Sequence, residues 1–339
     1  QGLLERWTER RLNMKELPIV SVAVITYNMA GYLSQLLDSI LIQKVNFPYE
    51  IIIDDDCSPD NTRELLYQYK EKYPDKIVLS LRDKNVGGSR NMYGVMQQCR
   101  GKYIAILEGD DYWDDENKLQ YQYDFMESHP EYVGMTCNSW CELSRTEEIR
   151  KVRRDIKEPM IFSYEDFMKP FFFDRLPNST DTWFFKNIFK TYDEDFSVFY
   201  RAHNMVWDQS LALILYGKGK VYVDPKIVSH HRTIVEKDGT NYQSKYAREN
   251  HCETDAYMYA MHEDYMENVL HRKCIPFYKV RADLFAEMFY RAWKSGDREE
   301  KAMVSRMWNQ RNKKWPLVAA CIRHGKETIG RKIKRICKG

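Results

Sequence analysis

The sequence predicts an α/β fold in which a mostly parallel sheet is flanked by helices and followed by a helical C-terminal region. Three observations lead to this fold class. Between residues 19 and 107, apolar strand-like runs alternate with segments of helical spacing, which is the pattern of βαβ units. These strands are almost unbroken apolar runs, as in a sheet covered on both faces. From about 245 to 313, Met and aromatic residues recur every three or four positions, which is helical spacing.

The elements can be placed in order along the chain. Strands are expected at 19–26, 49–53, 76–81 and 102–107. The helices between them are expected at 31–43, 60–73 and 89–99, and the second of these opens with a capping residue, Asp60 or Asn61. After residue 107 the alternation loosens, with a helix expected at 116–128 and strands at 132–140, 181–189 and 221–229. The charged stretch 147–158 is expected to be a solvated excursion.

The length of 339 residues suggests about two domains. We expect an N-terminal extension over 1–17, a sheet domain over 18–235, a helical region over 236–315 and a basic amphipathic tail over 316–339.

Composition excludes several classes of protein. The chain carries 52 Lys and Arg against 50 Asp and Glu, so general binding of nucleic acid is not expected. The longest uncharged run, Leu17 to Leu37, is interrupted by Pro18 and by polar residues, so it predicts no membrane-spanning helix. No signal-peptide pattern is present, and eight cysteines without a CxxC pair are typical of reduced thiols. We therefore expect a cytoplasmic protein.

Polar clusters follow the early strands at the points where the strands end. They lie at 26–28, 54–60, 85–88 and 108–113. Because the carboxyl ends of parallel strands share one edge of a sheet, and ligands bind open α/β sheets at that edge, these four clusters should converge on one crevice.

Acidic residues are densest after the fourth strand. Residues 108–116 hold six carboxylates: Glu108, Asp110, Asp111, Asp114, Asp115 and Glu116. Packed carboxylates repel one another unless they are protonated, solvated or neutralised, and oxygen-only ligands suit Mg²⁺ or Mn²⁺. The alternative is a solvated acidic turn with helix-capping Asp. The sequence lacks GxGxxG, GxxxxGK[ST] and GxSxG motifs, which argues against dehydrogenases, P-loop NTPases and α/β-hydrolases.

These residues resemble those of the inverting glycosyltransferases of family 2, of the bacterial surface-polysaccharide type. The resemblance rests on PIVSVAVITYN, EIIIDDDCSPDNT, KNVGGSRN, GKYIAILEGDDYW, NKLQYQ and WDQSLALILYGKGKVYVD, within about 18–235. It implies the GT-A fold and a nucleotide-sugar site in the crevice.

The resemblance also assigns roles on the donor side. It implies that Thr26, Tyr27 and Asn28 line the nucleotide, that Asp55 reads the base and that Asp56 supports the loop. Arg90 either contacts the nucleotide or is a helix-surface arginine. Glu108-Gly109-Asp110 falls on the family's DxD motif, so Glu108 would face the ribose and Asp110 would bind Mn²⁺ or Mg²⁺ on the diphosphate. A Glu at the first position departs from the family pattern.

On the acceptor side, the resemblance implies that Asp208 is the catalytic base, with Asp181 as its competitor. Trp113 either stacks on a sugar or wedges the turn into the core. Relatives often carry Arg-x-His after the last strand, whereas this chain has His230-His231-Arg232. Either histidine could replace the missing ligand, or both could lie in a helix or turn without a metal role.

The function implied is a metal-dependent inverting transfer of a sugar from a nucleotide-sugar, a UDP-sugar above all, to a saccharide or lipid-linked saccharide. The setting implied is the assembly of surface polysaccharide or wall polymer. A non-catalytic nucleotide-sugar-binding homologue is the alternative, with Glu108 as a mark of decay.

The tail over 316–339 predicts a contact with an anionic membrane surface, on the inner face of the cell membrane. It is rich in Lys and Arg, and its apolar residues share one face of a helix: Val318, Ile322, Ile329, Ile333 and Ile336. Alternatively, this stripe packs on the helical region.

Overall fold

The structure is a computed structural model that describes residues 17–143, 148–152, 156–167, 179–234, 244, 252–272, 276–296, 298–309 and 317–326. Almost all of the expected N-terminal extension lies outside these residues. The chain forms two compact units that interleave in sequence. The first consists of Gln1–Ser163, Leu176–Asp193 and Lys218–Ile234, and the second of Tyr164–Arg175, Glu194–Gly217 and Val235–Gly339. Segment 194–217, expected in the sheet domain, is therefore grouped with the helical region.

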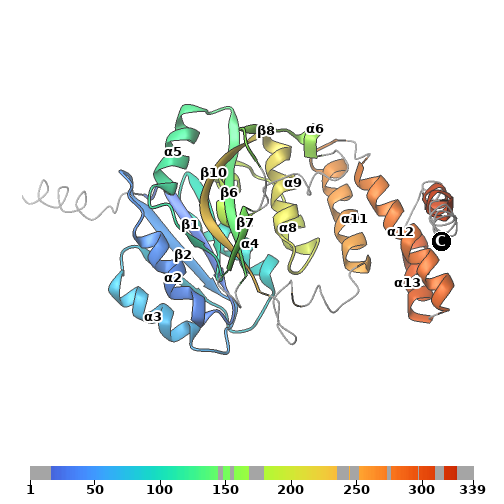
Figure 1. Cartoon of the computed structure of the whole chain (residues 1–339), viewed down its shortest axis with the longest axis horizontal. Coiled ribbons are helices and arrows are strands. Elements are labelled where there is room, and N and C mark those ends of the chain that lie inside the picture. The colour runs from blue at the N-terminus through green and yellow to red at the C-terminus, as the bar shows by residue number, and fades with distance from the viewer. Residues whose placement is uncertain are drawn as a thin grey trace, which may run out of the picture. The chain divides into compact units, whose positions relative to one another are not determined.

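The first half of the first unit is a parallel α/β sheet, as the alternation predicts. Its strands are β1 (Val20–Thr26), β2 (Tyr49–Asp55), β3 (Ile77–Leu81) and β4 (Tyr103–Glu108). They lie in the order β3-β2-β1-β4, all parallel. The neighbouring strands β1 and β2 are labelled in Figure 1. The helices between them are α2 (Ala30–Leu41), α3 (Thr62–Lys72) and α4 (Gly88–Gln98).

Helices cover both faces of this sheet. On one face, β1 presents Val20, Val22 and Val24 to a core that also contains Leu33 and Leu37 of α2. On the other face lies α4, which contacts β1 and β2 but contributes its buried residues to a separate layer. Because strand side chains alternate between the two faces, the unbroken apolar runs predicted this double cover.

The sheet continues beyond β4 with mixed strand directions, in the order β4-β9-β6-β10-β5. The short strand β9 (Phe184–Lys186) is antiparallel to β4 and to β6 (Tyr132–Leu143), while β10 (Lys220–Thr233) is parallel to β6. The end strand is β5 (Tyr112–Trp113), and α5 (Lys118–Ser128) follows it in the chain.

Two expectations beyond residue 107 are corrected. The strand expected at 181–189 is divided into η1 (Thr180–Thr182), β9 and α7 (Ile188–Thr191). The charged stretch expected to be a solvated excursion contains β7 (Glu148–Val152), which pairs antiparallel with β6. Main-chain pairing does not require apolar side chains, and charged residues are common on strands at a sheet margin. A further short strand, β8 (Met160–Phe162), pairs with β10.

The second unit is helical in its described parts. Its helices are α6 (Tyr164–Phe167), α8 (Val198–Arg201), α9 (Asp208–Lys218), α11 (Cys252–Asn268), α12 (Pro276–Ser295), α13 (Arg298–Asn309) and a further helix at 317–326. Within it, the Ser210 hydroxyl lies 2.8 Å from the ring of the buried His262, and burial lowers the pKa of His262 to about 3. No helix among the described residues is long and apolar enough to cross a membrane.

Gly101 provides a test of how tightly the sheet is built. A Cβ atom at this position would lie 2.7 Å from the Ser21 amide nitrogen and 2.9 Å from the Val20 carbonyl carbon, and backbone atoms cannot move away cheaply. We expect Gly101→Ala to lower the free energy of unfolding by about 1–3 kcal/mol. Gly31→Ala is the matched control, because nothing lies within 4 Å of a Cβ there and alanine favours the helix. Equal urea stability of the two variants would contradict the packing described.

Candidate functional site

The carboxyl edge of the parallel strands brings the predicted polar clusters together. Thr26 at the end of β1 is in register with Asp55 at the end of β2, and Asp55 is in register with Leu81 at the end of β3. On the other side of β1, Ile25 is in register with Glu108 at the end of β4. The prediction that these segments share one edge is therefore confirmed.

Asp55 lies at this edge but is fully buried. Its carboxylate accepts hydrogen bonds from Arg63 Nε at 2.6 Å, from the Ser58 amide at 3.1 Å and from the Ser58 hydroxyl. The same hydroxyl accepts from the amide of Asn28 at 2.9 Å, which links two residues expected to line the nucleotide. Asn28 is exposed and Tyr27 half-buried. A role of Asp55 in reading the base stays a prediction.

Asp56 joins the end of β2 to the loop before α4. Its two carboxylate oxygens accept hydrogen bonds from the amides of Val86 and Gly87, at 2.7 and 2.9 Å. Gly87 has a φ of 88°, a left-handed conformation that glycine adopts without strain. Arg90, one turn into α4, is exposed. Asp56 thus fixes the loop that leads to Arg90.

The Glu108-Gly109-Asp110 turn packs against the end of β1. A Cβ atom at Gly109 would lie 2.9 Å from the Thr26 hydroxyl oxygen, so close approach requires glycine here. That hydroxyl is buried and has no hydrogen-bond partner among the described residues. The Glu108 carboxylate accepts a 2.6 Å hydrogen bond from the Thr180 hydroxyl. The segment at η1, far along the chain, is therefore held against the turn.

Asp110 is partly exposed at the same turn. Burial, together with the neighbouring Asp111 carboxylate, raises the pKa of Asp110 to about 7, while His231 and Arg232 act in the opposite direction. A cation bound beside this carboxyl group would favour its ionised form.

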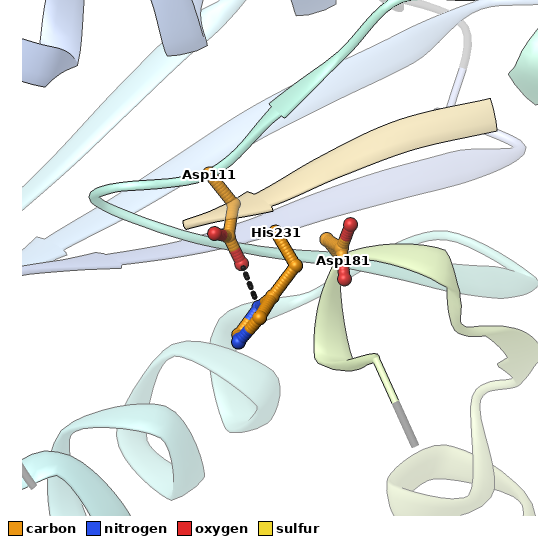
Figure 2. A group of neighbouring side chains, drawn as sticks. All are labelled: Asp111, Asp181 and His231. Carbon is orange, nitrogen blue, oxygen red and sulfur yellow. Dashed lines mark hydrogen bonds and ion pairs between the residues drawn. The ribbon is translucent and has the colours of Figure 1, made fainter. Parts of the chain in front are cut away.

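Asp111, Asp181 and His231 form a group whose ligand atoms lie within 4.8 Å of one another (Figure 2). The Asp111 Oδ2 atom lies 3.1 Å from His231 Nδ1, and Asp111 Oδ1 accepts a 2.8 Å hydrogen bond from the Arg232 amide. Asp181 is fully buried, and its Oδ2 atom has no hydrogen-bond partner among the described residues. Two carboxylates and an imidazole at this spacing could hold a divalent cation.

Sequence reasoning missed this group as a unit. The Asp doublet at 110–111 and the paired histidines were both visible, but their contact spans 120 residues of chain. Both histidines lie on β10 rather than in a helix or turn.

The structure decides between the two alternatives for Trp113, stacking on a sugar and wedging the turn into the core. Its side chain is only 2% exposed, and its indole nitrogen donates a 2.9 Å hydrogen bond to the Asp181 carbonyl oxygen. The ammonium of the buried Lys118 lies 4.1 Å from the centre of its ring. Trp113 therefore wedges the turn into the core, and a stacking role against an acceptor sugar is corrected. Its hydrogen bond helps to place Asp181.

Arg232 ties the acidic turn to the rest of the sheet. Its guanidinium donates to the Asp110 carbonyl oxygen at 2.7 Å and to Gln35 Oε1 at 2.5 Å. It also lies over the ring of Tyr112, 4.5 Å from the ring centre. His230 stacks on the same ring, with centroids 4.5 Å apart. Planar groups thus clamp the segment that follows Asp110.

Asp208 begins α9 and belongs to the second unit. Seven consecutive buried residues, 210–216, anchor that helix. The helix start expected from the sequence is confirmed, and the role of Asp208 as base stays a prediction.

A mixed sheet with an acidic turn at its carboxyl edge is the architecture expected of a glycosyltransferase of the GT-A fold. The family model described as glycosyl transferase family 2 matches residues 21–196, more than half of the chain, so the chain belongs to that family. The resemblance read from the motifs is confirmed.

The chain is also similar to individual proteins. It is 39% identical over 112 residues to an uncharacterized protein of Mycobacterium tuberculosis, covering 33% of this chain and 32% of that protein. It is 31% identical over 103 residues to the poly(ribitol-phosphate) beta-glucosyltransferase of Bacillus spizizenii, covering 30% of this chain and 16% of the relative. The matched regions thus span less than half the length of these relatives.

Among solved structures, S. aureus TarS 1–349 in complex with UDP-GlcNAc matches with a TM-score of 0.56 at 18% identity. The match covers 85% of this chain and 79% of that one. A likeness at this identity confirms the fold.

Arg232→Lys tests the clamp. Lysine cannot satisfy the Asp110 carbonyl and Gln35 together, and it does not stack as a plane on Tyr112. We expect a loss of about 1–3 kcal/mol in the free energy of unfolding, because buried acceptors are left unpaired. Urea denaturation measures it, with Arg90→Lys on the exposed face of α4 as the control. If the Arg232 variant is as stable as the control, the clamp contributes nothing.

Proposed function

We propose that the chain transfers a sugar from a UDP-sugar, with inversion, to a saccharide or lipid-linked saccharide during assembly of a surface polysaccharide or wall polymer. The observation that carries the proposal is the meeting of Thr26, Asp55 and the Glu108–Asp110 turn at one edge of the sheet. The unpartnered hydroxyl of Thr26 supports a ligand at this edge, because buried polar groups rarely lack a partner.

A divalent cation fits the residues at this edge. Asp181 has an oxygen without a hydrogen-bond partner among the described residues, and the imidazole of His231 offers a further ligand atom beside it. The raised pKa of Asp110 means that a nearby cation would favour its ionised form. Asp110 would hold the cation, as the motif implies. Asp111, Asp181 and His231 are the competing ligand set. When bound, Mn²⁺ or Mg²⁺ would neutralise charge that develops on the departing nucleoside diphosphate.

The side chains around the turn orient the donor in this proposal. Thr180 holds the Glu108 carboxylate in one position, where it would accept a hydrogen bond from the ribose. The longer side chain of Glu keeps the acceptor group that an Asp would supply. Asp55 and Asn28, fixed through Ser58, would form the wall at the base.

Inverting transfer needs one further carboxylate, which takes a proton from the acceptor hydroxyl as that oxygen attacks the anomeric carbon and the bond to the diphosphate breaks. We assign this role to Asp208, because the buried face of α9 holds its start rigidly. The complete burial of Asp181 supports a place among the cation ligands rather than on the acceptor side.

We also propose that the tail over 316–339 contacts an anionic membrane from the cytoplasmic side. Only 317–326 of it lies within the described residues, and this part is helical, as expected.

Asp110→Asn tests the cation assignment. We expect Mn²⁺-dependent binding of UDP to weaken by at least about tenfold, because the amide removes a charged ligand, while thermal stability stays near that of the parent chain. Titration calorimetry with and without EDTA measures it, and Glu71→Gln on the exposed surface of α3 is the control. If Asp110→Asn binds normally while Asp181→Asn and His231→Gln do not, the cation belongs to the competing set.

Asp208→Asn tests the base. We expect turnover to fall by about 10²–10⁴-fold, with little change in UDP or Mn²⁺ affinity, because the base acts on the acceptor. Asp195→Asn is the control, since Asp195 is an acid of the same unit whose carboxylate is occupied by Ser197. Near-normal turnover in Asp208→Asn, or loss of UDP binding in parallel, would remove Asp208 from this role. Absence of donor hydrolysis and transfer in the parent chain would favour a non-catalytic homologue.

A further inference from the structure

Charge is distributed unevenly along the chain. Residues 276–339 contain 17 lysines and arginines against 6 acidic residues, a net charge of +11. Residues 1–275 carry a net charge of −9, so the overall value of +2 hides two regions of opposite sign. The basic region begins with α12, forty residues before the tail that the sequence pattern singled out.

Helix α12 also exposes large aromatic side chains. It packs inward through Ala282, Phe285 and Ala286, which are buried. One or two turns further on, Phe289 and Trp293 are 41% and 74% exposed. They lie four residues apart and therefore neighbour each other on the helix surface. An indole this exposed is unusual for a residue that mostly lies buried in soluble proteins.

The helix at 317–326 packs against α12. Leu317 and Ala320 are buried in the same core as Phe285, so the two helices pack together. The ring of Tyr290 on α12 lies 6.4 Å from the ring of Trp293 and 5.2 Å from the ring of His324. Tyr290, three residues before Trp293, therefore contacts the second helix.

The two described residues of the tail's apolar stripe are not buried in this core. Leu317 and Ala320 are buried there, whereas Val318 is half-buried and Ile322 is 51% exposed. The described part of the tail thus leaves Ile322 open to solvent. Arg323 and Lys326 on this helix and Lys294 on α12 are also exposed.

We propose that α12 and the helix at 317–326 form a membrane-docking surface, in which Phe289 and Trp293 enter the headgroup layer and Lys294, Arg323 and Lys326 contact anionic lipid. The proposal deepens the tail contact under the proposed function. It is independent of the sugar chemistry.

An anionic lipid surface suits these residues better than other occupants do. Aromatic side chains beside basic ones are typical of the membrane interface. A second copy of the chain that docked through the same surface would bring a second region of +11 against the first, which opposes association. A soluble polyanion could neutralise the lysines and arginines but would leave the indole of Trp293 in water.

Co-sedimentation of the full chain with vesicles tests the proposal. We expect binding to phosphatidylglycerol–phosphatidylcholine vesicles and little binding to phosphatidylcholine alone. Phe289→Ala with Trp293→Ala should weaken the partition by about tenfold, and so should Lys294→Glu with Lys326→Glu. Binding should also fall as salt rises from about 0.1 M to about 1 M, where the Debye length shortens from about 10 Å to about 3 Å.

Matched controls separate this surface from general effects of charge and aromaticity. Tyr257→Ala removes a ring of the same unit that is 51% exposed, and Lys72→Glu with Lys84→Glu makes the same change in net charge elsewhere. Both should bind vesicles like the parent chain. If the aromatic variant and the lysine variant of this surface also bind vesicles like the parent chain, the proposal is wrong. That holds even if the surface binds a soluble polyanion such as polyphosphate. The oligomeric state is measured by analytical sedimentation. If the parent chain is a dimer that Trp293→Ala converts to a monomer, and vesicle binding does not change, the surface binds a second copy instead. Turnover of a soluble acceptor, measured in parallel, tests the proposed transferase function separately.

Discussion

A carboxylate that leaves water must find a hydrogen-bond donor or a cation, and at one edge of this sheet several carboxylates leave water together. The buried ones are Asp54, Asp55, Asp56, Asp111 and Asp181. The groups that stabilise these carboxylates differ from one to the next. Asp54 pairs with Arg82, Asp55 with Arg63, and Asp56 with two backbone amides. Asp111 accepts from a backbone amide beside an imidazole. Asp54 and Asp181 each keep one oxygen without a donor among the described residues, and only Asp181 of the two lacks an arginine beside its other oxygen.

These pairings decide where the loops go. Arg63 stands on α3 and Val86 in the loop before α4, so the carboxylates at the end of β2 hold two later connections against the sheet. The acidic turn after β4 is held in the same way by Thr180 and Arg232. These hydrogen bonds fix the loops at the carboxyl edge of the sheet. A binding site requires side chains that are held in place in this way.

Much of this could be predicted from the sequence, and the limit has a physical cause. Up to β4 the elements alternate, so the parallel strands and their shared edge follow from local patterns, and Thr26, Asp55 and Glu108 lie at that edge as predicted. Beyond β4 the sheet takes in the antiparallel β9, and neighbours in space cease to be neighbours in sequence. Asp111, Asp181 and His231 meet across that part of the fold, so no local spacing could reveal them. The two alternatives for Trp113 stayed open for a different reason. An aromatic residue after an acidic turn gives the same sequence pattern whether its side chain is buried or exposed.

The meeting point of Asp111, Asp181 and His231 has a mechanical consequence. The three residues come from the turn after β4, from η1 and from the last strand, so the chain between them forms two long loops closed at one point. Any ligand that contacts all three acts as a removable cross-link. It would stabilise the native state by mass action, and it would oppose local opening of η1, which is a single turn far along the chain from the other two residues. Occupancy of this three-residue group and the stability of the sheet's second half are therefore thermodynamically linked, and hydrogen exchange in the sheet would report whether a ligand is bound.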